Sequence, residues 1–219
     1  MSTEMVDLKA QLANEFAQLG KTVAPPTGHR ISLKGKTFTF PDGKTSPGPI
    51  TAVILDWISI NAYYKGAYNP QKVEAPACFA IAKLIDDLKP SENCADPQHE
   101  QCEGCQWNEW GSAPGGGRGK ACKNQIRIVI VPLDARTDTP PWTIDLAPSS
   151  VSAFTNFVNT VGGADLLPIQ TQVTIDFDPN ESYPKLTFAD PAPLPDELVV
   201  RMFELRKGVA PLLEKEPGT

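Results

Sequence analysis

Three cysteines near the middle of the chain have the type and spacing of metal ligands. Cys102 and Cys105 form a Cys-x-x-Cys pair, and Cys122 follows after a glycine-rich stretch. Two thiolates at this spacing can hold one tetrahedral zinc ion from a single turn, and Cys122 supplies a third thiolate. The residues that compete for the fourth position are Cys78, Cys94 and His99.

Cys78 is the preferred fourth ligand, with His99 as the alternate, because Cys78 would close the cysteine-rich segment back onto the strand region before it. The stretch from about residue 70 to residue 123 is rich in proline and glycine, so a bound metal is the expected source of its order. No His-Glu-x-x-His motif is present, which favours a structural Zn²⁺ over a catalytic one. Ordinary reduced thiols are the alternative. A redox pair is disfavoured, because the pair does not open a helix after a strand.

A segment without acidic residues follows, from Gly111 to Leu133. Its glycine-rich part lacks the spacing of a nucleotide-hydrolysing P-loop, because Ala121 follows Lys120. A flexible basic loop beside aromatic rings instead suits a single nucleic-acid strand, whose phosphates meet cations and whose bases stack on rings. The alternatives are a solvated loop and rings packed in the core. The candidate DNA-binding residues are Tyr63, Tyr64, Lys65, Tyr68, Trp107, Trp110, Arg118, Lys120, Lys123 and Arg127.

The rest of the sequence predicts a small β-rich barrel that positions these residues. Hydrophobic periodicity predicts helices over about residues 3–19, 151–161 and 196–214, the second capped by Ser149 or Ser150 and the third interrupted near Gly208 and Pro211. A hairpin is expected over 29–40 and a short helix near 80–88. Runs of β-branched and alternating apolar residues predict strands over 50–61, 125–133, 141–146, 172–177 and 183–188.

This order predicts a mainly β fold with helices, namely an OB-like barrel with a zinc-stabilised loop insertion and flanking helices. The expected parts are an N-terminal helix (1–24), a barrel (25–195) with the insertion at about 70–123, and a C-terminal helix (196–219).

Composition narrows the class of protein. The chain has 219 residues, of which 41% are hydrophobic, and a net charge of −6. This charge argues against a protein that coats duplex DNA by bulk positive charge. No run approaches the ~20 apolar residues of a membrane span, and the first residues lack the pattern of a signal peptide. The expectation is a cytoplasmic protein without membrane contact, whose cysteines are thiols or metal ligands.

Several short blocks resemble a family of tailed-bacteriophage proteins. The specific part of the resemblance is Asn108-Glu-Trp-Gly-Ser112 together with Gly119-Lys-Ala-Cys-Lys-Asn124. Further blocks are Pro76–Ala80, Val173–Phe177 and Tyr183–Phe188. The resemblance implies a single-stranded DNA-binding protein with an OB-type barrel, acting in phage replication or recombination in the host cytoplasm.

The sequence therefore favours a protein without enzymatic activity that binds single-stranded DNA, with replication or recombination proteins as further partners. One alternative is a phage protein-interaction module that binds a host or phage replication or defence protein through its acidic insertion and terminal helices. A metal-dependent hydrolase has less support. Its candidate carboxylates, Asp86-Asp87 and Asp176 with Asp178, are more simply read as a solvated helix face and a turn.

Overall fold

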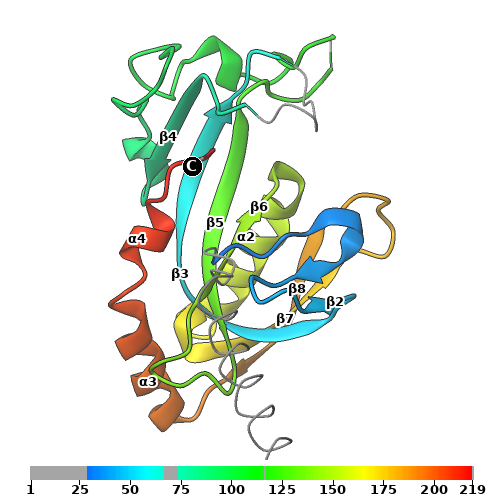
Figure 1. The fold of residues 1–219 in the computed structure, drawn as a ribbon, viewed down its shortest axis with the longest axis vertical. Helices are drawn as coiled ribbons and strands as arrows, with labels where there is room; N and C mark the ends of the chain where they lie inside the picture. Colours follow the sequence, from blue (N-terminus) through cyan, green and yellow to red (C-terminus); the bar gives the residue numbers. More distant parts are fainter. Residues whose placement is uncertain (1–28, 67–73, 116, 219) are drawn as a thin grey trace, which may run out of the picture.

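The computed structural model describes residues 29–66, 74–115 and 117–218 (Figure 1). The expected N-terminal helix and Tyr68 lie outside the described residues. The strands are β1 (Phe38–Thr39), β2 (Thr45–Ser46), β3 (Ile50–Tyr63), β4 (Cys78–Ala82), β5 (Lys123–Pro132), β6 (Trp142–Leu146), β7 (Thr171–Phe177) and β8 (Leu186–Pro193). The helices are α2 (Pro148–Gly162), α3 (Asp196–Arg206) and α4 (Ala210–Leu213), with 3-10 turns η1 (Lys34–Lys36), η2 (Ile85–Asp87), η3 (Gln106–Asn108) and η4 (Pro168–Gln170).

Six antiparallel strands form one curved sheet in the order β6-β5-β3-β7-β8, with β4 paired to β3 beside this path. The long strand β3 serves two regions. Its start, Ile50–Val53, pairs with β7, whereas its end, Ser59–Tyr63, pairs with β4. β5 accompanies β3 from Ala52 to Ala62. The β3–β5 pair therefore extends beyond the rest of the sheet as a ribbon, and the chain between the two strands folds at its end (Figure 1). We call residues 74–115 and 117–122 the lobe and the other described residues the body.

The body has an apolar layer on each face of its sheet. Successive residues of β3 point to opposite faces, so Ile54 belongs to one layer and Leu55 to the other. α2 covers the first layer, where Phe154 is 1% exposed and meets Trp57 edge-on at 5.6 Å between ring centroids. α3 and α4 cover the second layer, where Met202 is fully buried. Full burial of one such side chain contributes about 1.5–3 kcal/mol, so the body is held by its hydrophobic core.

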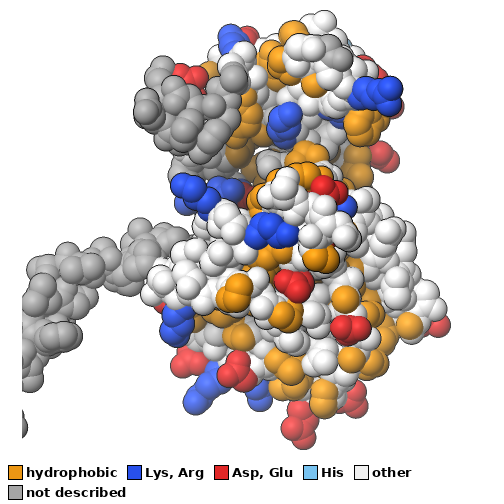
Figure 2. All heavy atoms as spheres, turned by 90° about the vertical axis from the view of Figure 1, so that its right-hand side faces the viewer, with side chains coloured by type: hydrophobic (Ala, Val, Ile, Leu, Met, Phe, Trp, Pro, Cys, Tyr) orange, Lys and Arg blue, Asp and Glu red, His pale blue; other side chains and the backbone are white. Residues whose placement is uncertain are grey.

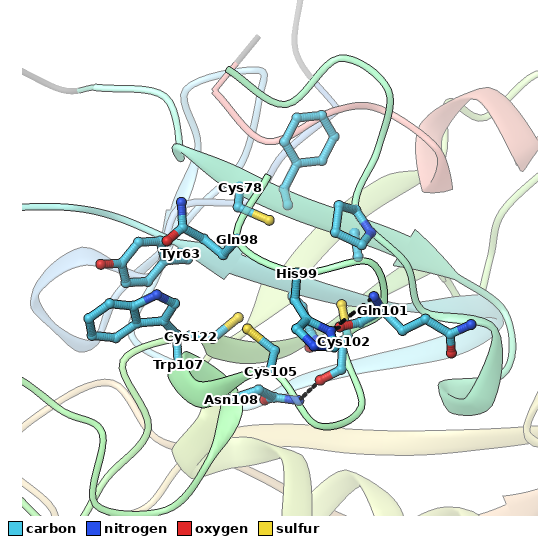
Figure 3. A pocket seen from close by; sticks show the side chains of 14 residues that line it. Tyr63, Cys78, Gln98, His99, Gln101, Cys102, Cys105, Trp107, Asn108 and Cys122 are labelled. Atoms are coloured by element: carbon cyan, nitrogen blue, oxygen red, sulfur yellow. Dashed lines mark hydrogen bonds between the residues drawn. The ribbon is translucent and has the colours of Figure 1, made fainter. Parts of the chain in front are cut away.

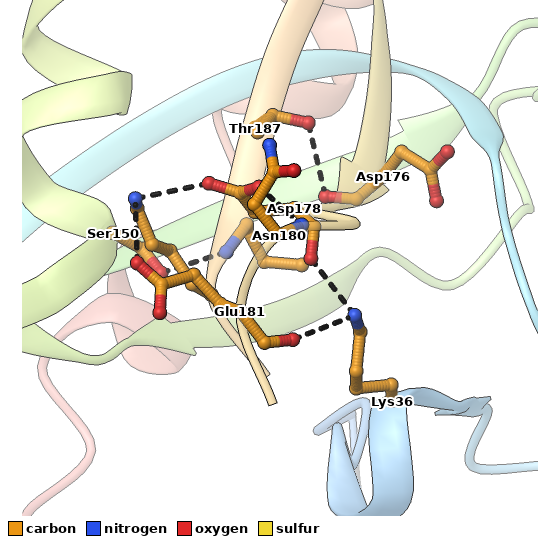
Figure 4. A network of polar contacts seen from close by, with 9 residues as sticks. Lys36, Ser150, Asp176, Asp178, Asn180, Glu181 and Thr187 are labelled. Carbon is orange, nitrogen blue, oxygen red and sulfur yellow. Dashed lines mark hydrogen bonds and ion pairs between the residues drawn. The ribbon is translucent and has the colours of Figure 1, made fainter. Parts of the chain in front are cut away.

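The segment before β1 links the two edges of the sheet. Arg30 forms a parallel bridge with Thr143 of β6. Lys36 donates hydrogen bonds to the carbonyl oxygens of Asp178 (2.8 Å) and Glu181 (2.9 Å) in the turn between β7 and β8 (Figure 4). Because these contacts reach both β6 and the β7–β8 turn, the body is compatible with a barrel-like fold. The expected mainly β fold with helices is confirmed at this level.

Several expected elements differ in detail. The helix expected near residues 80–88 is replaced by strand β4 and the short turn η2, because Phe79 and its neighbours pair with the exposed edge of β3. The hairpin expected over 29–40 contains a single bridge, Ser32 with Thr39, and β1 instead pairs with β2. α2 begins with Pro148 at its first position rather than with a serine cap. The predicted interruption of the last helix separates α3 from α4.

The lobe has few apolar contacts. Its buried cluster consists of Ala80, Leu88 and Cys102, with Ala82 packed against it. Such a cluster buries far less apolar surface than either layer of the body. Among the described residues, no helix combines the length and apolar character needed to cross a bilayer.

Candidate metal centre and nucleic-acid interface

The four preferred zinc ligands and the alternate ligand line one small cavity in the lobe (Figure 3). Its lining includes Cys78, Cys102, Cys105, Cys122 and His99. The cavity has a volume of about 20 Å³, which is the space taken by one or two water-sized spheres. Residues separated by more than forty positions in the sequence thus meet around a space that suits a single ion.

Local backbone contacts bring the thiols to this cavity. Cys78 begins β4, directly opposite Tyr63 of β3. The Cys102 amide donates to the Leu88 carbonyl at 3.1 Å, and the Cys122 amide donates to the Trp107 carbonyl at 2.8 Å. The first bond holds Cys102 against the segment that follows η2, and the second holds Cys122 against η3.

The Cys-x-x-Cys turn itself depends on one glycine. Gly104 has a φ of 71°, a conformation that side chains with a Cβ disfavour. The Cys105 carbonyl then accepts a hydrogen bond from the Asn108 amide at 2.8 Å as η3 begins. The turn therefore directs both thiols of the pair toward the cavity.

The thiols influence one another electrostatically. Burial, together with the neighbouring Cys102, Cys105 and Cys78, raises the pKa of Cys122 to about 12. Burial also raises the pKa of Cys78 to about 11. For Cys102 burial again raises the pKa, although a hydrogen bond with the Asn61 side chain opposes the shift. In the absence of a cation these thiols are protonated at neutral pH, and a divalent ion would favour their thiolates.

The types of side chain at this cavity suit a metal ion, but their positions do not form a coordination site. Four thiols and an imidazole are the ligand types that zinc prefers. Within residues 29–66, 74–115 and 117–218, however, no group of three or more His, Cys, Asp or Glu side chains has a geometry that holds a metal ion. The side chains would have to turn toward a common point in order to bind one.

Cys94 and His99 are distinguished from the other candidates by their contacts. The Cys94 thiol donates to the Phe79 carbonyl and accepts from the Phe79 amide, both at 3.1 Å, and it is not part of the cavity lining. His99 is exposed, and its Nδ1 lies 2.9 Å from the Gln101 carbonyl oxygen. Cys78 and His99 both line the cavity and Cys94 does not, and Cys78 as the fourth ligand stays a prediction.

The aromatic candidates fall into two groups. Tyr63 and Trp107 stack on each other at 5.0 Å between ring centroids with an interplanar angle of 21°, so each ring has one face covered. Trp110 is 79% exposed, and the Lys120 ammonium lies 5.5 Å from its ring centroid. Tyr64 is 41% exposed. Among the candidate rings that the structure describes, Trp110 and Tyr64 are therefore the accessible ones.

The basic candidates also fall into two groups, those beside Trp110 and those that are paired with a carboxylate. Arg118 and Lys123 are exposed, and Lys120 is half-buried with its ammonium 3.4 Å from the Asn108 side-chain oxygen. Lys65 forms an exposed ion pair with Asp96 at 2.6 Å, and this hydrogen bond raises the pKa of Lys65. Arg118, Lys120 and Lys123 remain as cations beside the exposed Trp110.

The interpretation of Arg127 as a phosphate contact is corrected by the structure. Arg127 is 6% exposed, and its Nε donates to Asp145 at 2.7 Å. Its Nη1 donates to the carbonyl oxygens of Leu213 at 3.1 Å and of Lys215. Because the guanidinium is buried and bonded to the C-terminal segment, we assign it a structural role.

Sequence reasoning missed a group of three asparagines at the base of the lobe. Asn124 donates to the side-chain oxygens of Asn61 at 2.7 Å and Asn108 at 2.8 Å. Asn61 and Asn124 also lie directly opposite each other in the β3–β5 ladder. Asparagine is depleted in strands. Asn61 at the end of one β-branched run and Asn124 at the start of another were therefore the sequence signal that could have indicated this group.

No family model, curated protein or solved structure matches this chain.

Proposed function

We propose that the protein binds single-stranded DNA through an OB-type barrel whose surface is extended by a zinc-ordered lobe. The observation that carries this proposal is the exposed Trp110 ring beside Lys120, in a segment that also exposes Arg118 and Lys123. A ring next to several cations offers stacking to a base and neutralisation to the flanking phosphates.

The order of elements supports the OB assignment. Along the chain, β3, β5 and β6 precede α2, and β7 and β8 follow it, with β3 central between β5 and β7. The lobe then occupies the connection between the first and second barrel strands. In OB folds this connection is one of the loops that bind oligonucleotides. The acid-free segment begins in the lobe and runs through the whole of β5, so it includes the place where such a loop would meet the strand.

The zinc assignment is supported by the convergence of thiols on one small cavity and by the small apolar cluster of the lobe. A further indication is the Trp107 indole Nε1, a buried donor without a hydrogen-bond partner among the described residues. It lies in the same lining, where a thiolate sulfur would offer it an acceptor. Cys78, Cys102, Cys105 and Cys122 would hold the ion, which fixes the lobe rather than taking part in a reaction.

The test of DNA binding is a titration of fluorescently labelled oligo-dT at increasing salt. Neutralisation of phosphates by Arg118, Lys120 and Lys123 predicts a slope of the log affinity against log salt of roughly −0.7 per contact, near −2 in all. Trp110→Ala should weaken binding by about 1–3 kcal/mol through the loss of one stacked base. Phe203→Ala is the matched control, because Phe203 is a partly exposed ring on the distant helix α3. Absence of binding at low salt would contradict the proposal.

The second candidate is a protein-interaction module, favoured by one observation. Val200 (64% exposed) and Phe203 (39% exposed) lie one turn apart on α3 and present apolar surface. Such a pair suits a partner protein. Under this function, the protein would bind a replication or defence protein saturably, and the double variant Val200→Ser, Phe203→Ser would lose this binding. The protein would not bind oligo-dT.

A further inference from the structure

A cleft of about 430 Å³ lies where the lobe meets the body. Its lining comes from β3, β5, the segment around η2, the Cys-x-x-Cys turn and the start of α2. Figure 2 shows the molecule narrowing between the lobe and the body. The volume falls within the range of small-molecule sites. The cleft adjoins the small thiol-lined cavity, with which it shares Asn61, Cys102 and Asn108.

The walls of the cleft are apolar on both sides. Leu88 and the 74% exposed Ile85 come from the lobe, whereas Ile126 and Val151 come from the body. Apolar side chains on two opposing parts of the molecule suit a flat ring that is buried on both of its faces.

The floor of the cleft is formed by amides from the two ribbon strands. Both N–H groups of the Asn124 side chain are used, one by Asn61 and one by Asn108. This leaves the Asn124 side-chain oxygen, which accepts no hydrogen bond from the described part of the chain. Asn61 is 4% exposed and contacts the Cys102 thiol, so the orientation of the floor depends on the lobe. The result is a fixed acceptor at the base of an apolar slot.

The amides and the hydroxyl of the lining can both donate and accept, so the balance of the cleft is set by its charged groups and by the Asn124 oxygen. Besides the Asn124 oxygen, the carboxylates of Asp86 and Glu103 contribute to the lining, whereas the charged donor is Lys120. A neutral ring that donates hydrogen bonds through an amino group matches this set. Cytosine, adenine and guanine carry such an amino group, and thymine does not. The carboxylates also repel phosphate, which places the backbone of the ligand outside the cleft, near Lys120.

We propose that this cleft binds one unstacked, amine-bearing nucleobase of the bound strand, an inference that rests on the proposed single-stranded DNA binding. Lys120 connects the two sites, because its ammonium lies over the Trp110 ring and it also lines the cleft. A strand that stacks one base on Trp110 therefore places a neighbouring base at the mouth of the cleft. The protein should accordingly prefer oligo-dC to oligo-dT, two pyrimidine strands of equal charge.

The experiment compares the dissociation constants of labelled oligo-dC and oligo-dT for the full chain and for Ser59→Phe. Ser59 is half-buried in the cleft lining, and its hydroxyl makes no hydrogen bond within the described residues, so the larger ring fills the cleft without removing a polar contact. Thr51→Phe is the matched control, because Thr51 is exposed on the same strand at its other end. We expect a preference of the unaltered protein for oligo-dC of roughly tenfold, the effect of one well-made base contact.

Ser59→Phe should lose this preference and keep its salt slope, and Thr51→Phe should retain both. If the protein binds oligonucleotides but Ser59→Phe shows the same preference, or if oligo-dT binds as tightly as oligo-dC, the cleft inference is wrong while DNA binding stands. If no oligonucleotide binds, the proposed function fails, and titration with dCMP decides the cleft. A saturable shift of the Asn124 side-chain NMR signal that is absent in Ser59→Phe supports the site, and no shift overturns it.

Discussion

The body and the lobe share the β3–β5 ribbon but are held together by different interactions. In the body, two layers of fully buried aliphatic and aromatic side chains cover both faces of the sheet. In the lobe, the buried cluster consists of Ala80, Leu88 and Cys102, with Ala82 packed against it, while four thiols line one cavity. Apolar burial is enough to explain the stability of the body, whereas the lobe needs another source of order. A metal ion on its thiols is the source we propose.

The largest expected effect belongs to the core of the body. Phe154→Ala removes a ring that is 1% exposed and packed against Trp57 and Phe188. The free energy of unfolding should fall by about 4 kcal/mol, measured by urea unfolding followed by circular dichroism. Phe203→Ala, at a partly exposed ring on α3, is the control and should cost much less. Equal losses of unfolding free energy in the two variants would contradict the conclusion that the hydrophobic core holds the body together.

The second effect concerns the buried ion pair that ties the C-terminal segment to β5. Arg127→Met leaves the Asp145 carboxylate with only Arg30 at 3.4 Å as a cationic neighbour among the described residues. The free energy of unfolding should fall by about 3 kcal/mol. Hydrogen exchange should increase first at residues 212–215, whose carbonyls Arg127 holds. An unchanged unfolding curve would show that the pair is dispensable.

The third prediction separates the two regions directly. Cys105→Ser should leave the unfolding midpoint of the body unchanged and make the lobe at least about tenfold more sensitive to protease, because the metal no longer orders it. Cys94→Ser is the matched control, since Cys94 lies outside the cavity lining and a hydroxyl can replace its bonds to Phe79. Equal sensitivity of both variants would count against a metal held by Cys105.

The smallest effect is at the surface of the lobe. Arg118→Ala should reduce the salt slope of oligo-dT binding by roughly 0.7 and leave stability unchanged, because Arg118 is exposed. Arg136→Ala removes a similarly exposed arginine on the β5–β6 connection and should leave the slope unaltered. A slope that does not respond to Arg118→Ala would remove this residue from the interface.

Local patterns predicted most of the body. The β-branched run that became β3 and the helical stripe that became α2 are signals carried by neighbouring residues, and both elements formed close to the expected bounds. β4 was missed because a strand of five residues beginning at Cys78 has little pattern of its own and depends on pairing with β3. β4 forms because the long strand β3 offers it an edge to pair with.

Contacts between distant segments limited the prediction of the site. The spacing of Cys102 and Cys105 predicted a shared zinc ion, which stays a prediction, and the structure places both residues with Cys78 in the lining of one cavity. The burial of Arg127 had no local signal, because its partners are the carbonyls of a segment 85 or more residues away. The facing of Asn61 and Asn124 likewise depends on the register of two strands, which the order of residues within either strand does not determine.

If a metal-ordered lobe binds single-stranded DNA, removal of the metal should weaken binding and its return should restore it. The affinity for oligo-dC is measured on protein purified without added zinc, again after chelation, and again after zinc is returned, with metal content determined at each step. The account predicts about one equivalent of zinc at the start, weaker binding after chelation, and recovery with zinc. Unchanged affinity after complete removal of the metal would contradict it.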